Sequence, residues 1–224
     1  MEVEAKLRTA SRRTLAAIGR RRRLGEYRLT PVGVRNLETI YLDTSRRDLL
    51  RAGIALRLRR LDHRGVELTV KRRGKVTAGI HRRPETTWTL REMPRLPLTL
   101  RRRELRALER FTAGRPLVPL VGTRIRRRAI LVVRHGGTAP VAEIACDDVR
   151  YFRPAGDRSV SSRGADYEVE VELLGGEEKD LRALVRGLRA SYALRPSSGS
   201  KLARALRWAG VRVPVRKRGQ TPFR

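Results

Sequence analysis

Several short segments of the sequence alternate charged and apolar residues, which is the pattern of a β-strand with one charged face. The chain opens with this alternation over residues 2–6 (EVEAK), and Glu168, Glu170 and Glu172 repeat it near the other end. Three carboxylates about 6.6 Å apart along one strand face repel one another unless a cation lies among them. These acids therefore indicate a site in which a metal ion or basic side chains neutralise them.

Segments between the two acidic ones carry basic residues in the same alternating pattern. Arg57 and Arg59 alternate with leucines, and Lys71 alternates with Leu68 and Val70 in a second segment. The planar fork of arginine and the compact ammonium group of lysine are well suited to phosphate oxygens. Acidic and basic strand faces in one chain indicate that arginine strands and a divalent metal together neutralise the acids.

The total charge says less than the placement of the charged residues. The formal net charge is +30, and the 53 basic residues divide into six lysines and 47 arginines. So unequal a ratio is typical of a compositional bias that replaces surface lysines by arginines. A polyanionic partner is expected, but charge alone does not choose between a phosphate compound and nucleic acid.

The periodicities predict an α+β protein built on a mainly antiparallel sheet, with helices covering the apolar face of the sheet. The length of the chain suffices for one main domain with a substantial core. Helices are expected at residues 11–22, 45–52, 101–111 and 177–192. Beyond the alternating segments, strands are expected at residues 37–43, 79–90, 123–133, 139–147 and 148–152.

Several classes of protein are disfavoured by features that the sequence lacks. It contains no run of about 18 apolar residues and no secretory signal pattern, so a cytoplasmic protein without a membrane span is expected. Cys146 is the only cysteine, which excludes an internal disulfide and a cysteine-based zinc cluster, and its strand pattern predicts a core thiol. Neither a Walker A nor a GxGxxG motif occurs, which disfavours nucleotide binding by those routes.

An ordered series of motifs resembles the CYTH domain, the fold of the triphosphate tunnel metalloenzymes. The opening EVEAK matches the ExExK signature of that family, and further segments follow in the family's order. These are YLDT at residues 41–44, AGIALRLRR at 52–60, LTVKRRGKVTAGIHRRPE at 68–85, EIACD at 143–147, YEVEVELLGG at 167–176 and the pair Ser200 and Lys201. The resemblance spans residues 1–208, which we take as the domain, and leaves residues 209–224 as a basic tail or the start of a linker.

Within the family, the stretch at residues 74–85 is most similar to the bacterial inorganic triphosphatase branch. Longer members of that branch often carry a helical CHAD domain, which is not present in this sequence. The resemblance implies an eight-stranded antiparallel β-barrel that forms a tunnel, with charged side chains pointing inward and helices packed outside.

The resemblance also implies roles for individual residues. Basic side chains would bind the phosphates, and carboxylates would hold Mg²⁺ or Mn²⁺ as the cofactor. The implied phosphate-binding residues are Lys6, Arg57, Arg59, Lys71, Arg83, Arg127 and Lys201, with Arg126 and Arg128 as alternatives to Arg127. The implied metal ligands are Glu2, Glu4, Asp147, Glu168, Glu170 and Glu172. Glu4, Glu170 and Lys71 are the expected catalytic residues.

Other residues with chemically active side chains receive simpler interpretations. Glu85 is expected to orient Arg83 or Lys71 by ion pairing. Tyr41 and Asp43 are expected to organise the turn before the helix at residues 45–52. The histidines lack metal-ligand spacing and are expected at the surface or at the tunnel mouth; they are His63, His81 and His135.

The activity that the resemblance implies is metal-dependent hydrolysis of inorganic triphosphate to pyrophosphate and phosphate. Alternatives of the same fold are thiamine triphosphatase, nucleoside or RNA 5′-triphosphatase and class IV adenylyl cyclase. The chain has few aromatic residues, and Trp88 is the sole one near a tunnel motif, which favours a substrate without an organic group. A module that binds polyphosphate or nucleic acid without turnover is disfavoured, because it gains nothing from carboxylates among its arginines.

Overall fold

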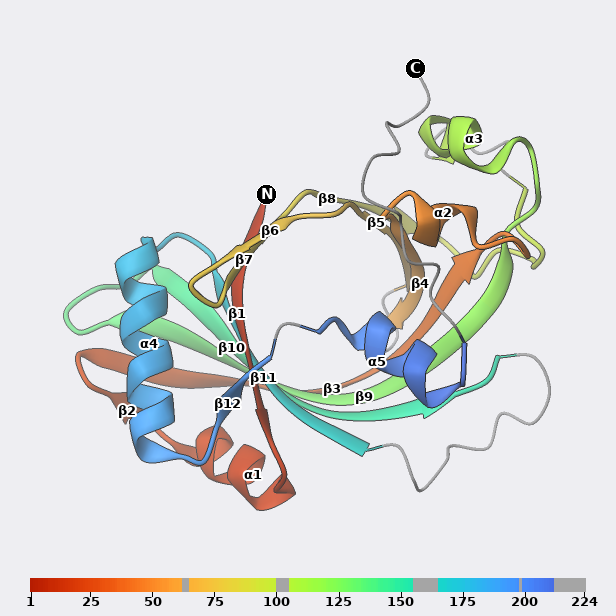
Figure 1. Ribbon diagram of the computed structural model, residues 1–224. Coiled ribbons are helices and arrows are strands. Elements are labelled where there is room, and N and C mark those ends of the chain that lie inside the picture. The colour runs from red at the N-terminus through yellow and green to blue at the C-terminus, as the bar shows by residue number, and fades with distance from the viewer. Residues whose placement is uncertain (62–64, 100–104, 155–164, 198, 212–224) are drawn as a thin grey trace.

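The computed structural model describes residues 1–61, 65–99, 105–154, 165–197 and 199–211 (Figure 1). The helices among them are α1 (Arg12–Arg20), α2 (Asp48–Arg51), α3 (Arg106–Thr112), α4 (Glu178–Ser191) and α5 (Lys201–Trp208). The strands are β1 (Glu2–Thr9), β2 (Arg23–Leu24), β3 (Tyr27–Asp43), β4 (Ala55–Leu61), β5 (Gly65–Lys71), β6 (Lys75–Thr77), β7 (Ile80–Arg83), β8 (Glu85–Leu90), β9 (Val118–Arg134), β10 (Pro140–Phe152), β11 (Ala165–Leu173) and β12 (Arg195–Pro196). No helix in the described part of the chain is long and apolar enough to cross a membrane.

The strands form one antiparallel sheet of twelve strands. Its order is β6-β7-β1-β11-β10-β9-β3-β4-β5-β8, while β12 pairs with β1 and β2 pairs with β3. The sheet curls around a central space, so that β8 returns towards β6 and β7 (Figure 1). The predicted α+β fold with a mainly antiparallel sheet is confirmed. The implied barrel is wrong in two details, because the sheet has more than eight strands and no pairing between β6 and β8 closes it in the described residues.

Pro84 accounts for part of this difference. The alternation over residues 79–90 predicts one strand, but the structure has β7 before Pro84 and β8 after it. Proline has no N–H to donate to a strand ladder and is tolerated mainly where pairing is interrupted. The two halves therefore pair with different neighbours, β7 with β1 and β8 with β5.

β3 and β10 are longer than the sequence predicts. Residues 139–147 and 148–152 form the single strand β10, and β3 begins at Tyr27 rather than near residue 37. Pro31 and Gly33 resemble strand breakers in the sequence, but the register of β3 against β9 shifts at these two residues. Gly33 has a φ of 136°, which a residue without a Cβ adopts easily. The two residues thus mark a bulge that bends a continuous strand.

Helices cover the outer face of the sheet at two separate places. Under α1 and α4, buried residues such as Leu7, Val171 and Leu184 form one apolar cluster. Under α2 and α3, residues such as Leu58 and Leu108 form a second. The sequence expectation that helices pack on the apolar face is confirmed for these four helices.

α5 departs from that expectation, because it lies inside the curled sheet (Figure 1). Its residues Leu202 and Leu206 pack against Leu37, Val121 and Val149 in a third apolar cluster. The inner face of the sheet is therefore apolar beneath α5 and charged elsewhere. The N-cap of α5 is Ser200, whose Oγ accepts a hydrogen bond from the backbone N–H of residue 203 at 3.1 Å.

Candidate functional site

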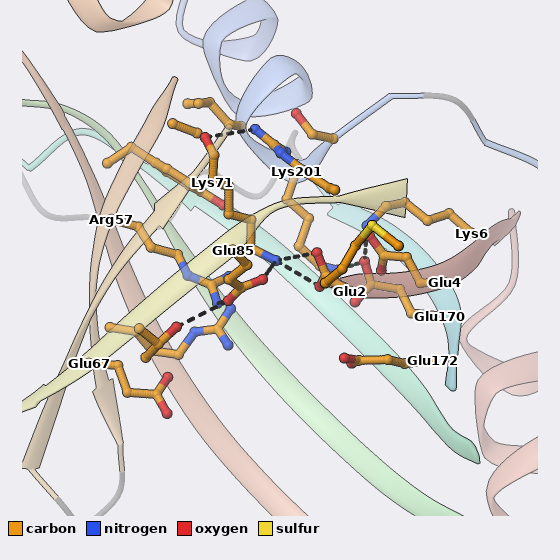
Figure 2. A pocket seen from close by; sticks show the side chains of 18 of the residues that line it. Glu2, Glu4, Lys6, Arg57, Glu67, Lys71, Glu85, Glu170, Glu172 and Lys201 are labelled. Carbon is orange, nitrogen blue, oxygen red and sulfur yellow. Dashed lines mark hydrogen bonds and ion pairs between the residues drawn. The ribbon is translucent and has the colours of Figure 1, made fainter. Parts of the chain in front are cut away.

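The inner face of the sheet and the start of α5 enclose a cavity of about 600 Å³ (Figure 2). Charged side chains make up most of its lining. All seven predicted phosphate-binding residues line it, namely Lys6, Arg57, Arg59, Lys71, Arg83, Arg127 and Lys201. Four of the six predicted metal ligands also line it, namely Glu2, Glu4, Glu170 and Glu172, together with Glu67 and Glu85.

Pairing of β1 with its two neighbours brings the acidic residues together. Glu4 lies directly opposite Glu172 of β11, and Lys6 lies opposite Glu170. On the other side of β1, Glu2 lies opposite Arg83 of β7. Like charges directly opposite each other destabilise a sheet. The Glu4 and Glu172 pair therefore indicates a place where a cation is needed.

The two lysines from the strands form ion pairs with these carboxylates (Figure 2). Lys71 Nζ lies 2.8 Å from Glu2 Oε1 and 2.5 Å from Glu85 Oε2. Lys6 Nζ lies 2.7 Å from both Glu4 Oε1 and Glu170 Oε1. Burial alone would lower the pKa of Lys6, but the charges of its two carboxylate partners raise it above the ordinary value. Of the two partners expected for Glu85, the ion pair is found with Lys71, and Glu85 also contacts Arg57, which was not expected, at 3.4 Å.

The arginines of β4 are held in place but keep donors available. Arg59 is 8% exposed, and its Nε donates a hydrogen bond to Thr39 Oγ1 at 3.2 Å. Burial and the positive charges of Arg57 and Arg127 lower the pKa of Arg59 to about 9. Arg57 Nε is buried without a hydrogen-bond partner in the described residues. Both observations indicate a site that is suited to binding an anion.

Arg127 is the arginine of its segment that faces the cavity. Its Nε and Nη2 donate hydrogen bonds to the two carboxylate oxygens of Asp147 at 2.8 and 2.7 Å. Nη2 also donates to Glu170 Oε2 at 2.9 Å. Arg126 is exposed, and Arg128 packs against Gly19 of α1 on the other face of the sheet. The strand alternation thus decides among the three alternatives that the sequence left open.

Asp147 and Glu168 lie behind the cavity wall rather than in it. Both are fully buried, and neither lines the cavity. Lys201 Nζ lies 3.0 Å from Asp147 Oδ2 and 2.7 Å from Glu168 Oε2, and it also reaches Glu170 Oε1 at 2.8 Å. Burial opposes ionisation of Glu170, yet Lys201 and two further cations hold its pKa well below the ordinary value. These acids act in the structure as counter-charges that fix the basic residues.

Arg204 belongs to the same network and was not predicted. Its Nε donates to Asp166 Oδ2 at 2.8 Å and its Nη2 to Glu168 Oε2 at 2.7 Å, which ties α5 to β11. Nη1 donates to the carbonyl of Gly199 at 2.6 Å, just before the helix. The spacing of Arg204 three residues after Lys201 is the signal that could have identified it, but 47 arginines obscure it.

Glu172 is the acid that best indicates a metal. No hydrogen bond or ion pair joins it to a described residue, and burial together with the charges of Glu2 and Glu4 raises its pKa to about 7. These carboxylates offer the oxygen ligands that Mg²⁺ and Mn²⁺ prefer. The donor chemistry thus fits a divalent ion, although no three acids of the described chain are already gathered in metal-binding geometry.

The remaining singled-out residues lie outside this charged cluster, with one exception. Tyr41 lines the cavity, whereas Asp43 organises the turn before α2 as expected, because it accepts hydrogen bonds from the backbone N–H groups of residues 44, 49 and 50. Cys146 is buried in the core. His81 Nε2 contacts a backbone carbonyl at 3.2 Å, His135 is exposed, and His63 lies outside the described residues.

Comparison with protein families agrees with this geometry. The model of the CYTH domain matches residues 1–206. The chain belongs to the CYTH family. Members of this family are triphosphatases or cyclases that use divalent metals, so the CYTH chain is assigned to a family of enzymes. None of the curated proteins compared with the chain is a match.

Solved structures similar to this CYTH chain show the same fold. One is a Hippeastrum protein, described as a candidate adenylyl cyclase that reveals a dominant triphosphatase activity. It has a TM-score of 0.63 and 19% identity, and the match covers 96% of this chain and 98% of that one. A second is the PH1819 protein of Pyrococcus horikoshii, with a TM-score of 0.56, 17% identity, and coverage of 92% and 99%. A third is described as a candidate adenylate cyclase of Bacillus halodurans, with a TM-score of 0.52, 17% identity, and coverage of 91% and 96%.

Proposed function

We propose that this CYTH chain hydrolyses inorganic triphosphate to pyrophosphate and phosphate, with Mg²⁺ or Mn²⁺, in the cavity between the sheet and α5. The observation that carries the proposal is the lining of the cavity. Seven basic and six acidic side chains surround it, while Tyr41 is the one aromatic residue among its lining residues in the described chain. A bare polyanion with a metal ion matches that lining better than a substrate with an organic ring.

The basic residues would bind the phosphate oxygens. Arg57 and Arg59 present guanidinium groups from one strand, and the lowered pKa of Arg59 means that an anion beside it would be favourable. Lys6, Lys71 and Lys201 approach from β1, β5 and α5, so they surround the same space from three directions. Neutralising and positioning a polyphosphate in this way is the main requirement for phosphoryl transfer to water.

The acidic residues would have two roles in this proposal. Glu2, Glu4 and Glu172 are the first candidates to hold the metal, because they lie in the cavity and repel one another in its absence. When bound, the ion would neutralise phosphate oxygens and lower the pKa of water. Glu170 stays ionised because of its cationic partners, so we assign it to fixing Lys6 and Lys201 rather than to accepting a proton.

Release of phosphate from tripolyphosphate, thiamine triphosphate and ATP, each with Mg²⁺, Mn²⁺ or EDTA, tests the proposal, and cyclic AMP and pyrophosphate are measured separately for ATP because cyclisation releases no phosphate. The expected result is fastest release from tripolyphosphate with a metal and none with EDTA. Faster turnover of ATP with formation of cyclic AMP would identify a cyclase, and faster turnover of ATP or thiamine triphosphate without it would identify a triphosphatase for organic substrates. Tight binding of tripolyphosphate without turnover under any condition would show a binding module and refute the enzymatic proposal.

A further inference from the structure

A groove of about 650 Å³ lies on the outer face of the sheet and is separate from the cavity. The residues that line it differ entirely from those of the cavity. It is bordered by α1 through Arg12 and crosses β3, β4, β9 and β10 between the two outer apolar clusters. Its charged lining residues are Arg12, Arg60, Arg124, Arg126, Arg150, Glu38 and Asp148.

Strand alternation explains why these charges point away from the cavity. Glu38 lies between Leu37, which packs beneath α5, and Thr39, which contacts Arg59 of the cavity. Arg124 and Arg126 flank Ile125, which also packs beneath α5. Neighbours along a strand point to opposite faces of the sheet. The groove therefore collects the outward-facing charges of the strands whose inward-facing residues contact α5 and the cavity.

The charged residues of the groove form a row across four strands. Arg150 pairs in register with Arg124, Arg124 with Glu38, and Glu38 with Arg60. With neighbouring strands about 4.8 Å apart, the row extends roughly 14 Å. Arg126 lies two residues from Arg124 and begins a second row on the same face. This arrangement can contact several linked phosphates at once.

Three of the five arginines are fixed by acids, and two are not. Arg124 Nε lies 2.9 Å from Glu38, while Asp148 holds both Arg12, at 3.0 Å, and Arg150, at 3.4 Å. Arg60 and Arg126, by contrast, are exposed, and no ion pair or hydrogen bond links either to a described residue. Five arginines against two acids leave the lining of the groove with an excess of positive charge.

We propose that this outer groove binds a chain of inorganic polyphosphate. Arginine forks contact phosphate oxygens in pairs, and several such contacts along a linear polyanion release its counterions. The lining contains no aromatic residue on which a nucleobase could stack, which is the usual means of holding a single strand of nucleic acid. Phe152 lies beneath Arg124 with 5.0 Å between the guanidinium carbon and the ring centre, but it is only 1% exposed.

The proposal is tested by reversing the two unpaired charges with Arg60→Glu and Arg126→Glu in one protein. The control carries Arg186→Glu and Arg189→Glu on the exposed side of α4, which changes the net charge by the same amount. Binding of long-chain inorganic polyphosphate is measured by calorimetry in EDTA, so that no turnover occurs, at several salt concentrations. Thermal unfolding and tripolyphosphate hydrolysis with metal are measured in parallel.

The expected result is a loss of polyphosphate affinity of about tenfold or more in the groove variant, with a salt dependence reduced by about two counterions. The control should lose less than threefold, and tripolyphosphate hydrolysis should stay within twofold in both. Equal losses in both variants, or no loss in either, would overturn the proposal. If a uridine oligonucleotide binds as tightly as polyphosphate and loses the same factor, the groove serves nucleic acid and the proposal is wrong. Should the charge reversal impair folding, Arg60→Gln with Arg126→Gln is compared with Arg186→Gln and Arg189→Gln, which changes the net charge by the same amount.

Discussion

Replacing Lys201 by methionine tests whether the buried charge network holds α5 inside the sheet. The side chain of Lys201 is 8% exposed, and its ammonium group contacts Asp147, Glu168 and Glu170 at 2.7 to 3.0 Å. Methionine keeps the length and the apolar part of the side chain but removes the charge. The variant therefore isolates the electrostatic contribution from packing.

The expected loss in the free energy of unfolding depends on the ion pairs that remain after the substitution. Breaking a buried ion pair by removing one partner costs about 3–5 kcal/mol, because a buried charge is left uncompensated. The lower end applies here, since each carboxylate keeps at least one cation. The remaining contacts, each at 2.7 Å, join Asp147 to Arg127, Glu168 to Arg204 and Glu170 to Lys6. We expect Lys201→Met to lower the free energy of unfolding by about 3 kcal/mol, which for a chain of this size lowers Tm by about 6–12 °C.

Thermal unfolding at pH 8 and pH 5 measures this effect and its origin. In the parent protein Glu170 and Asp147 have lowered pKa values, so they stay ionised at both pH values. In Lys201→Met the pKa of at least one of these acids should rise above its unfolded value of about 4. The folded variant then binds an extra proton as the pH falls, so its stability increases and the deficit in Tm should be smaller at pH 5 than at pH 8.

Lys179→Met is the matched control. Lys179 is also paired with a glutamate, at 2.9 Å, but both side chains are mostly exposed. Its loss should change the stability by less than about 1 kcal/mol, as for other surface pairs. A Tm of Lys201→Met within 2 °C of the control at pH 8 would refute the reasoning. A large deficit that is equal at pH 5 and pH 8 would attribute the effect to packing rather than to charge.

Three further substitutions test other parts of the structure. Glu4→Gln should reduce tripolyphosphate hydrolysis at least about 100-fold while Tm stays within a few degrees, because it removes a proposed metal ligand; full activity would contradict that assignment. Asp180→Ala should lower the free energy of unfolding in urea by about 2–3 kcal/mol at pH 7, because Asp180 accepts hydrogen bonds from Arg134 at 2.9 and 2.7 Å and from Tyr27 at 2.9 Å. The pKa of Asp180 is lowered to about 2, so its contribution is present above the unfolded pKa of about 3.9, and the difference from the parent should shrink as the pH falls towards 2. Gly122→Ala should destabilise by about 1–3 kcal/mol in the same assay, because its Cβ would lie 2.2 Å from the buried ring of Phe152, and a second change, Phe152→Leu, should recover part of the loss.

The charged faces of the strands could be predicted because the side-chain period of a strand is fixed at two. Once Glu4 faces the cavity, Glu2 and Lys6 must do so as well, and the same holds for Glu170 and Glu172. Register then places Glu4 against Glu172, which no property of either segment alone determines. The sequence thus indicates which residues share a face, and the pairing of strands decides which of them meet.

The place of α5 could not be predicted in this way. An amphipathic helix with Leu202 and Leu206 on one side can cover an apolar surface on either face of the sheet, and only the curl of the whole sheet decides which. The same uncertainty affects Asp147 and Glu168. Their motifs match those of metal ligands. In the structure, however, Lys201 of α5 forms an ion pair with Asp147 and Arg204 of α5 forms one with Glu168, so both acids lie among cations behind the cavity wall.

The ion pairs inside the cavity mean that its two proposed ligands should help each other to bind. Lys6 and Lys71 are engaged by Glu4, Glu170, Glu2 and Glu85, so a triphosphate that arrives alone must compete with carboxylates that also repel it. A divalent ion that draws Glu2 and Glu4 away would leave each lysine with a single carboxylate partner, Glu170 for Lys6 and Glu85 for Lys71, and so make both more available to phosphate. The coupling is reciprocal, because the free energy by which metal tightens phosphate binding equals that by which phosphate tightens metal binding. The ion pairs within the cavity would in this sense discriminate against polyanions that arrive without metal.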